Sequence, residues 1–241
     1  MKYQQKVKKS RSFLIITILF LTTFLTFKIF KKVNFQDVSI FGSDLFSIED
    51  IVDNSALDFP TRLIFIKTKY IEKELKKNLS LENVSVFRQI FPFGLKITIK
   101  TRIPIAYGER IFKGGKITGF IDKDGIFIDE KYTDKENLKK LSTKVFGWKE
   151  NYSKTLSNIL NFQKNNEVEF VTVNYSQNGY LKVEEKVLKT ILLGFNPKII
   201  ETQLQIIIDI KDQIKEKNIL EKIDNIDLSD PSNPKIKVFK P

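Results

Sequence analysis

The chain begins with a long apolar run between two basic clusters. Phe13–Phe27 (FLIITILFLTTFLTF) contains no charged residue, and the apolar stretch continues through Lys28 to Phe30. Eighteen helical residues rise roughly 27 Å, close to a hydrocarbon core of about 30 Å, with Lys28 reaching outward. The threonines in the run form no polar stripe at helical spacing, so the pattern predicts a membrane-spanning helix over residues 13–30 and not a buried core helix.

A cleavable signal peptide shares the charged start and the apolar middle of this segment. Cleavage requires small residues after the run, whereas Phe27–Val33 reads FKIFKKV, so an uncleaved anchor is favoured. Five Lys or Arg residues precede the run and three follow it. By the positive-inside rule, residues 1–12 form a cytoplasmic tail and residues 33–241 lie outside the membrane.

After the anchor, the apolar spacing changes repeatedly between that of strands and that of helices. Residues 38–40 predict a short strand that ends at Gly42. Ser47 stands three residues before Asp50, a spacing close to a capping box, and predicts a short helix from Ile48. This half of the pattern therefore gives a strand followed by a helix.

A second helix and a hairpin follow. Thr68 is expected to cap a helix in which Ile71, Leu75 and Leu79 recur every four residues. Two alternating strands come next, at residues 84–86 and 95–99, joined by a turn at residues 91–94. The predicted order over about 70 residues is strand, helix, helix, strand, strand.

The remaining sequence is mixed and rich in strands. Asp124-Gly125 supplies the positive φ of a tight hairpin between residues 117–121 and 126–128. Asn196 is expected to cap a helix with Pro197 in its first turn and a buried stripe from Ile200 to Ile214. Further elements are expected as a helix near 154–163 and strands at 168–173, 180–183, 189–193, 223–228 and 235–239.

These elements and their order resemble the FtsQ/DivIB family of bacterial cell division proteins. In the first half the resemblance rests on Val38–Gly42, Leu63–Ile66, Val84–Arg88, Pro92–Ile99 and Arg102–Ala106, with Thr101 at a position where the family has an acid. In the second half it rests on Ile121–Ile128, on Gly194 after a strand and on Ile226–Ser229, where Ser229 replaces the family's arginine.

The resemblance implies an α+β protein of known organisation. We expect a cytoplasmic tail (1–12), a transmembrane helix (13–30), a POTRA domain (34–103) and an FtsQ-type β domain with two or three helices (104–241). It also implies a scaffold of the division machinery that is located at midcell.

Charge and residue usage restrict the chemistry. Residues 1–32 contain eight of the 41 basic residues and none of the 29 acids, so the overall net charge of +12 is mostly a topology signal and not a nucleic-acid footprint. The chain has no Cys and no His, which excludes disulfides and removes the commonest general base and metal ligand. We expect no enzyme, no cofactor and no small-molecule substrate.

Two weak alternatives for a chemical site remain. A Ser-Lys dyad is open to a chain without His or Cys, at Ser142 with Lys144 or at Ser153 with Lys154, but solvated surface residues explain these pairs more simply. A calcium site at Asp122, Asp124 and Asp129 lacks the acidic spacing and terminal Glu of a calcium loop. No catalytic or metal residue is therefore predicted.

A partner site at the end of the chain follows from the resemblance. In the FtsQ family the C-terminal strands take up FtsB, with FtsL attached to it, as an added β-strand. An ordinary edge strand covered by its own domain is the alternative. Carried onto this chain, the contacting residues are Asp230, Ser232, Lys235, Ile236, Lys237, Val238 and Phe239, with Ser232 at the family's serine, Phe239 at its aromatic, and Asp230 where an aromatic is common.

Two other classes of protein compete with this reading. A membrane-anchored periplasmic hydrolase would need catalytic residues, and none is predicted. A POTRA-containing translocation component would need an array of about ten-residue alternating strands, which the sequence lacks. The sequence therefore favours a single-pass scaffold of the plasma (inner) membrane that binds FtsB-like and FtsL-like partners.

Overall fold

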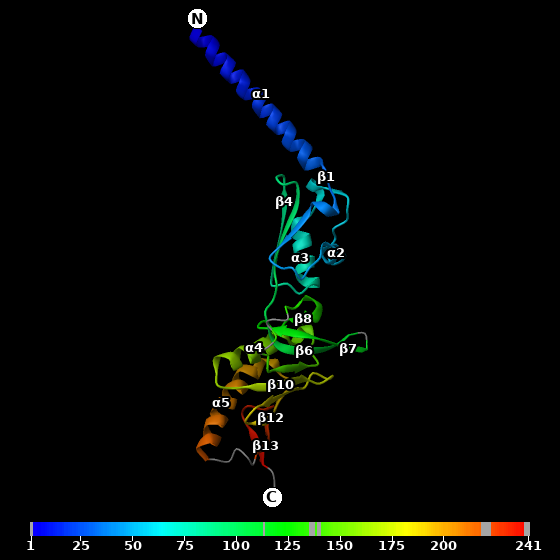
Figure 1. Ribbon diagram of the computed structural model, residues 1–241. Coiled ribbons are helices and arrows are strands. Elements are labelled where there is room, and N and C mark those ends of the chain that lie inside the picture. Colours follow the sequence, from blue (N-terminus) through cyan, green and yellow to red (C-terminus); the bar gives the residue numbers. More distant parts are fainter. Residues whose placement is uncertain (1, 113, 135–137, 139–140, 218–222, 239–241) are drawn as a thin grey trace. The chain divides into compact units, whose positions relative to one another are not determined.

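The computed structural model describes all residues except 1, 113, 135–137, 139–140, 218–222 and 239–241. The chain divides into two compact units, residues 1–101 and 102–241. The first unit begins with the helix α1 (Lys2–Phe30), drawn in blue in Figure 1. Its segment Phe13–Phe30 has a mean hydropathy of 2.2 and no buried residue, so it is long and apolar enough to cross a membrane.

The rest of the first unit is a small sheet with helices. The strand order of the three-stranded sheet is β2-β5-β4, with β2 (Val38–Phe41) parallel and β4 (Asn83–Gln89) antiparallel to β5 (Gly94–Lys100). Besides these, β1 (Lys32–Val33) pairs with β3 (Thr61–Arg62). The remaining elements are η1 (Phe35–Asp37), α2 (Ile48–Asp53), η2 (Leu63–Phe65) and α3 (Thr68–Asn78).

This unit confirms the predicted order of strand, helix, helix, strand, strand. The Ser47 Oγ accepts the Asp50 N–H at 3.1 Å, and the Asp50 carboxylate accepts the Ser47 N–H at 3.0 Å, so α2 begins with a full capping box. The predicted cap of the second helix is wrong. Thr68 is already the first residue of α3, and the N-cap is Lys67, which makes no side-chain capping bond.

The second unit is built on a single mixed sheet. Among the described residues, nine strands follow the order β14-β13-β12-β11-β10-β9-β6-β7-β8. They are β6 (Pro104–Phe112), β7 (Gly115–Asp122), β8 (Phe127–Asp129), β9 (Lys144–Phe146), β10 (Phe170–Tyr175), β11 (Leu181–Glu185), β12 (Lys189–Gly194), β13 (Ile223–Asp227) and β14 (Lys235–Val238).

Two helices complete this unit. The helices α4 (Ser153–Asn165) and α5 (Ile200–Lys217) lie next to each other, and their apolar stripes share one core with the sheet (Figure 1). The short 3-10 turn η5 (Glu150–Tyr152) precedes α4, and η6 (Pro197–Ile199) precedes α5. A third such turn, η3 (Glu130–Tyr132), follows β8. The Asn196 Oδ1 accepts the Lys198 N–H at 3.1 Å, so Asn196 caps this segment as predicted, although a 3-10 turn intervenes before α5.

The hairpin at Asp124-Gly125 is also present. Ile121 pairs with Phe127, and Gly125 has a φ of 72°, as the predicted turn requires. The larger role of β7 was not predicted, because its main partner is the nine-residue strand β6. The α+β fold class is confirmed: an apolar N-terminal helix, a POTRA-like sheet and a β-rich part with a few helices.

Candidate partner-binding edge

The predicted partner residues fall at the end of the large sheet. β14 is the first strand in the sheet order and pairs antiparallel with β13, with Ile236 opposite Ile226 and Lys235 opposite Asp227. No other described strand pairs with its outer side. One row of backbone N–H and C=O groups of β14 is therefore open among the residues that the structure describes.

The side chains of β14 are all exposed. Ile236 and Val238 are 46% and 50% exposed and, being two residues apart, share one face of the strand. Lys235 and Lys237 lie on the other face, where the Lys237 Nζ is 3.6 Å from the Asp224 Oδ2 on β13. The strand thus presents an apolar face and a basic face beside its open edge.

Asp230 and Ser232 occupy the turn that leads into β14. The Asp230 Oδ1 accepts the Ser232 N–H at 3.0 Å, and the Asp230 carbonyl accepts the Asn233 N–H at 3.1 Å. This is an Asx-type turn, so Asp230 shapes the loop and does not extend the strand. Phe239 lies outside the described residues. The structure therefore brings residues 235–238 together on one strand and separates Asp230 and Ser232 from it.

The segment that directly follows β13 is tied to α5 and to the start of the next turn. The buried Gln203 of α5 donates from Nε2 to the carbonyls of Leu193 and Leu228, each at 2.7 Å. The backbone N–H of Ser229 donates to the Asp227 Oδ1 at 2.9 Å, and this bond, with the Ser229 side chain and Lys235, lowers the pKa of Asp227. Asp227 is thus ionised at neutral pH and fixes the start of the turn.

Another sheet edge in the chain is protected by a side chain. On β4, the edge strand of the small sheet, the backbone N–H of Val86 donates to the Glu72 Oε1 of α3 at 2.8 Å. Burial alone would raise the pKa of Glu72, but this bond and Lys69 outweigh it and lower that pKa. In the described part of the chain, no side chain bonds to the backbone of residues 235–238 in this way, so β14 is the less protected edge.

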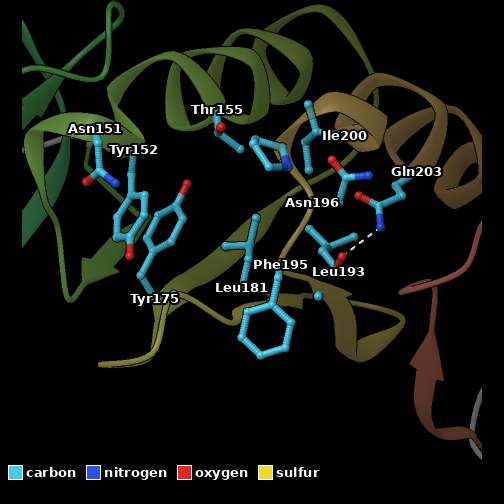
Figure 2. Close-up of a pocket in the computed structure, with 13 residues that line it drawn as sticks. Asn151, Tyr152, Thr155, Tyr175, Leu181, Leu193, Phe195, Asn196, Ile200 and Gln203 are labelled. Atoms are coloured by element: carbon cyan, nitrogen blue, oxygen red, sulfur yellow. Dashed lines mark hydrogen bonds between the residues drawn. The ribbon is translucent and has the colours of Figure 1, made fainter.

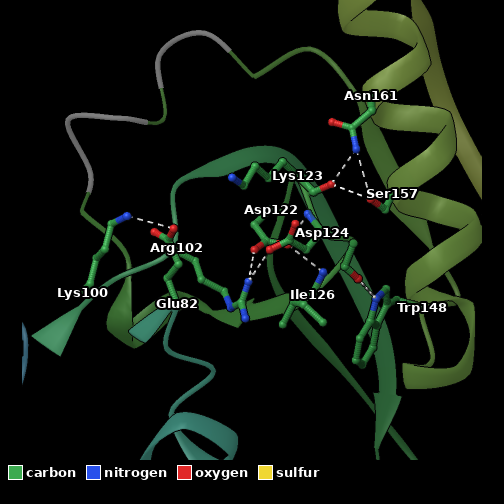
Figure 3. Close-up of polar contacts among 11 residues, drawn as sticks. Glu82, Lys100, Arg102, Asp122, Lys123, Asp124, Ile126, Trp148, Ser157 and Asn161 are labelled. Atoms are coloured by element: carbon green, nitrogen blue, oxygen red, sulfur yellow. Dashed lines mark hydrogen bonds and ion pairs between the residues drawn. The ribbon is translucent and has the colours of Figure 1, made fainter. Parts of the chain in front are cut away.

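The carboxylates of the suggested calcium site are bonded to the protein itself. Figure 3 shows the Arg102 Nη1 bonded to Asp122 and to the Asp124 Oδ2, the latter at 3.0 Å. The Asp122 Oδ1 also accepts the N–H groups of Asp124 and Ile126. Within the described ranges there is no group of three metal-ligating side chains.

The suggested dyad at Ser153 has another hydrogen bond. The Ser153 Oγ donates to the Glu150 carbonyl at 2.8 Å, which directs the hydroxyl to the backbone of the preceding turn. Ser153 is the first residue of α4 and is half-buried. This contact favours the interpretation of Ser153 as a helix-start residue over that of a nucleophile.

A pocket that sequence reasoning missed lies between the starts of α4 and α5 and the strands β10–β12. Its volume is about 280 Å³, and Figure 2 shows the Tyr175 hydroxyl and the Gln203 amide on its two sides with Leu181 between them. The Tyr175 ring stacks on Tyr152 with centroids 4.3 Å apart, and its burial raises its pKa, so the hydroxyl stays protonated. No residue of the predicted edge lines this pocket, and no local sequence pattern marks it.

The architecture defines a class: a protein with an apolar N-terminal helix, a POTRA domain and a β-rich second domain. Residues 33–102 match the family of FtsQ-type POTRA domains. A cell division protein DivIB of Bacillus cytotoxicus is 28% identical over 127 residues, which cover 51% of this chain and 48% of that protein. The match thus spans about half the length of the curated relative. The chain is thus similar to FtsQ-type POTRA domains over residues 33–102 and to a DivIB protein over about half of its length.

Proposed function

We propose that this protein is a single-pass, non-enzymatic scaffold of the cell division machinery. The relative is a cell division protein, and the FtsQ-type POTRA domain lies directly after an apolar helix, where a membrane anchor belongs. In this proposal residues 1–12 are cytoplasmic, residues 13–30 span the plasma membrane, and a POTRA domain (34–103) and a β domain (104–241) lie outside. The protein gathers at midcell when the cell divides.

The proposed activity is capture of a partner strand at β14. An FtsB-like polypeptide, carrying an FtsL-like one, adds a strand along the open side of residues 235–238. Main-chain hydrogen bonds would supply the affinity, and contacts with side chains would supply selectivity. The observation that carries this proposal is the position of β14 as the outermost strand, with Ile236 and Val238 about half exposed.

Charge substitutions on the apolar face of β14 test this proposal. The double variant I236D/V238D should lose co-purification with the FtsB-like partner, because two carboxylates would remain unpaired in the apolar part of the interface. Val171 offers a matched control: it is a β-branched residue with 39% exposure on β10, a central strand of the same sheet. V171D should retain the partner.

Two readouts complete the experiment. Circular dichroism must show that I236D/V238D is folded, and a fluorescent fusion must show whether it reaches the division site. If folded I236D/V238D captures the partner as well as V171D does, the binding edge is not β14. A protein that never gathers at midcell would contradict the division role as a whole.

A further inference from the structure

A hairpin of the POTRA domain lies against the anchor helix. The turn between β4 and β5 carries Phe91, whose ring stacks on that of Phe24 in α1, with centroids 5.9 Å apart and planes at 14°. Figure 1 shows this hairpin reaching to the end of α1. Phe24 lies six residues before Phe30, so it is roughly 9 Å inside the end of the apolar run. In the membrane orientation proposed above, a ring stacked on Phe24 would lie near the depth of the outer acyl chains.

Two lysines extend this contact toward the helix end. Lys28 follows Phe24 by four residues, so both lie on one face of α1, and Lys31 is the first residue after the helix. The Lys28 Nζ is 5.6 Å from the Phe91 ring centroid, and the Lys31 Nζ is 4.5 Å from that of Phe93. Lysines near the end of a membrane-spanning helix extend their ammonium groups to the interface, and an ammonium group above an aromatic ring is attracted to it.

Backbone hydrogen bonds also join the end of α1 to the rest of this unit. Residues 32–33, directly after α1, pair with residues 61–62 of the same unit. The Leu63 N–H donates to the Lys31 carbonyl at 3.2 Å, which places η2 beside the end of the helix. Phe65 in η2 is 62% exposed. The hairpin and η2 thus offer exposed apolar side chains where the chain leaves α1.

We propose that the tip of the β4–β5 hairpin enters the outer leaflet of the bilayer and is a second membrane contact of the POTRA domain. This inference rests on the proposed membrane anchor. Phe91 is 68% exposed in the protein alone, and in this proposal phospholipid acyl chains cover it. The phosphates of anionic headgroups would face Lys28 and Lys31. The domain would then be held at a fixed height and orientation above the membrane.

The absence of cysteine allows a direct test of depth. Single-cysteine variants L19C, F91C and F87C of the full chain would carry a nitroxide label in vesicles of phosphatidylethanolamine and phosphatidylglycerol. L19C reports on the anchor. F87C is the matched control, because Phe87 is also exposed, at 56%, and lies on the same hairpin but farther from its tip. The measurement compares relaxation by oxygen, which enriches in lipid, with relaxation by a water-soluble nickel chelate.

The expected result is a loss of nickel access at F91C, to the level of L19C, with full access at F87C. If F91C is as accessible to nickel as F87C while L19C is protected, the hairpin stays in water and this inference is overturned, although the anchor stands. If L19C is itself accessible to nickel, the anchor is wrong and the inference fails with it.

Discussion

Lys211 and Glu185 form an ion pair inside the β-rich domain, with the Lys211 Nζ 2.9 Å from the Glu185 Oε1. The two side chains are 10% and 0% exposed. The second carboxylate oxygen of Glu185 accepts the N–H groups of Val187 and Leu188, at 2.6 and 2.7 Å. The pair joins α5 to the end of β11, on the half of the sheet that leads to β14.

Removal of Lys211 should destabilise the protein strongly. K211M leaves the Glu185 charge buried without its partner, and we expect a loss of about 3 to 5 kcal/mol in the free energy of unfolding, measured by urea denaturation. E185Q/K211M should recover part of this loss, because the amide oxygen can still accept both backbone N–H groups. If K211M unfolds at the same urea concentration as the parent, the pair does not support the fold.

The same pair predicts a pH dependence. Burial alone would raise the pKa of Glu185, but the hydrogen bonds from Lys211 and from the backbone of Leu188 and Val187 outweigh it, so the pKa lies below its ordinary value of 4.5. A carboxyl whose pKa is lowered on folding contributes stability above its unfolded pKa and loses it as the pH falls through the folded value. The stability of the parent should therefore fall more steeply below pH 4.5 than that of E185Q/K211M, as urea titrations at several pH values would show.

Gln203 should matter for the rigidity of the partner edge. Q203L removes both hydrogen bonds to the carbonyls of Leu193 and Leu228, which remain buried, and we expect a loss of about 1 to 3 kcal/mol in unfolding free energy. Because Leu228 directly follows β13, amide hydrogen exchange should also quicken in β13 and β14. Q205L, at an exposed position two residues away on the same helix, is the control and should change neither quantity.

Gly125 should not tolerate a side chain. A Cβ at this position would lie 2.1 Å from the Ser153 carbonyl oxygen, and the φ of 72° is unfavourable for other residues. G125A should lower the midpoint of thermal unfolding, measured by calorimetry. Gly114 provides the comparison: its φ is also positive, at 79°, but apart from its chain neighbours no residue lies within 4 Å of its added Cβ. An equal effect of G114A and G125A would show that backbone strain alone is responsible.

Loss of the capping box of α2 should have a smaller effect on stability. S47A removes the acceptor of the Asp50 N–H and should cost about 1 kcal/mol of unfolding free energy. S47D keeps an acceptor at the N-cap and should retain much of that stability, although it places a second carboxylate near Asp50. Chemical denaturation of both variants measures the difference. Equal stability of S47A and the parent would mean that the cap adds nothing to this domain.

The parts of the fold that the sequence predicts well are those with local signals. The apolar run of residues 13–30, the capping box at Ser47 and the hairpin at Gly125 each depend on neighbouring residues, and the structure contains all three. The Thr68 cap is the local exception. Thr68 is the first residue of α3, one position after the N-cap, and the sequence alone does not distinguish these two positions.

The long-range partners could not be predicted in this way. The long strand β6 is not among the strands that the sequence predicts, because its partners β7 and β9 are set by the folded sheet. Gln203 and Lys211 look like surface residues of an amphipathic helix, and their buried partners come from strands far away in sequence. The Tyr175 pocket arises likewise from segments that meet only on folding. The β14 edge was predictable only through the family resemblance.

The central claim is that β14 receives a partner strand, and site-specific crosslinking tests it most directly. A photoreactive amino acid at Ile236 or Val238, in dividing cells, should crosslink to the FtsB-like partner, and the same group at Val171 should not. Crosslinks of equal yield from Val171, or none from either β14 position while the partner still co-purifies, would contradict the account.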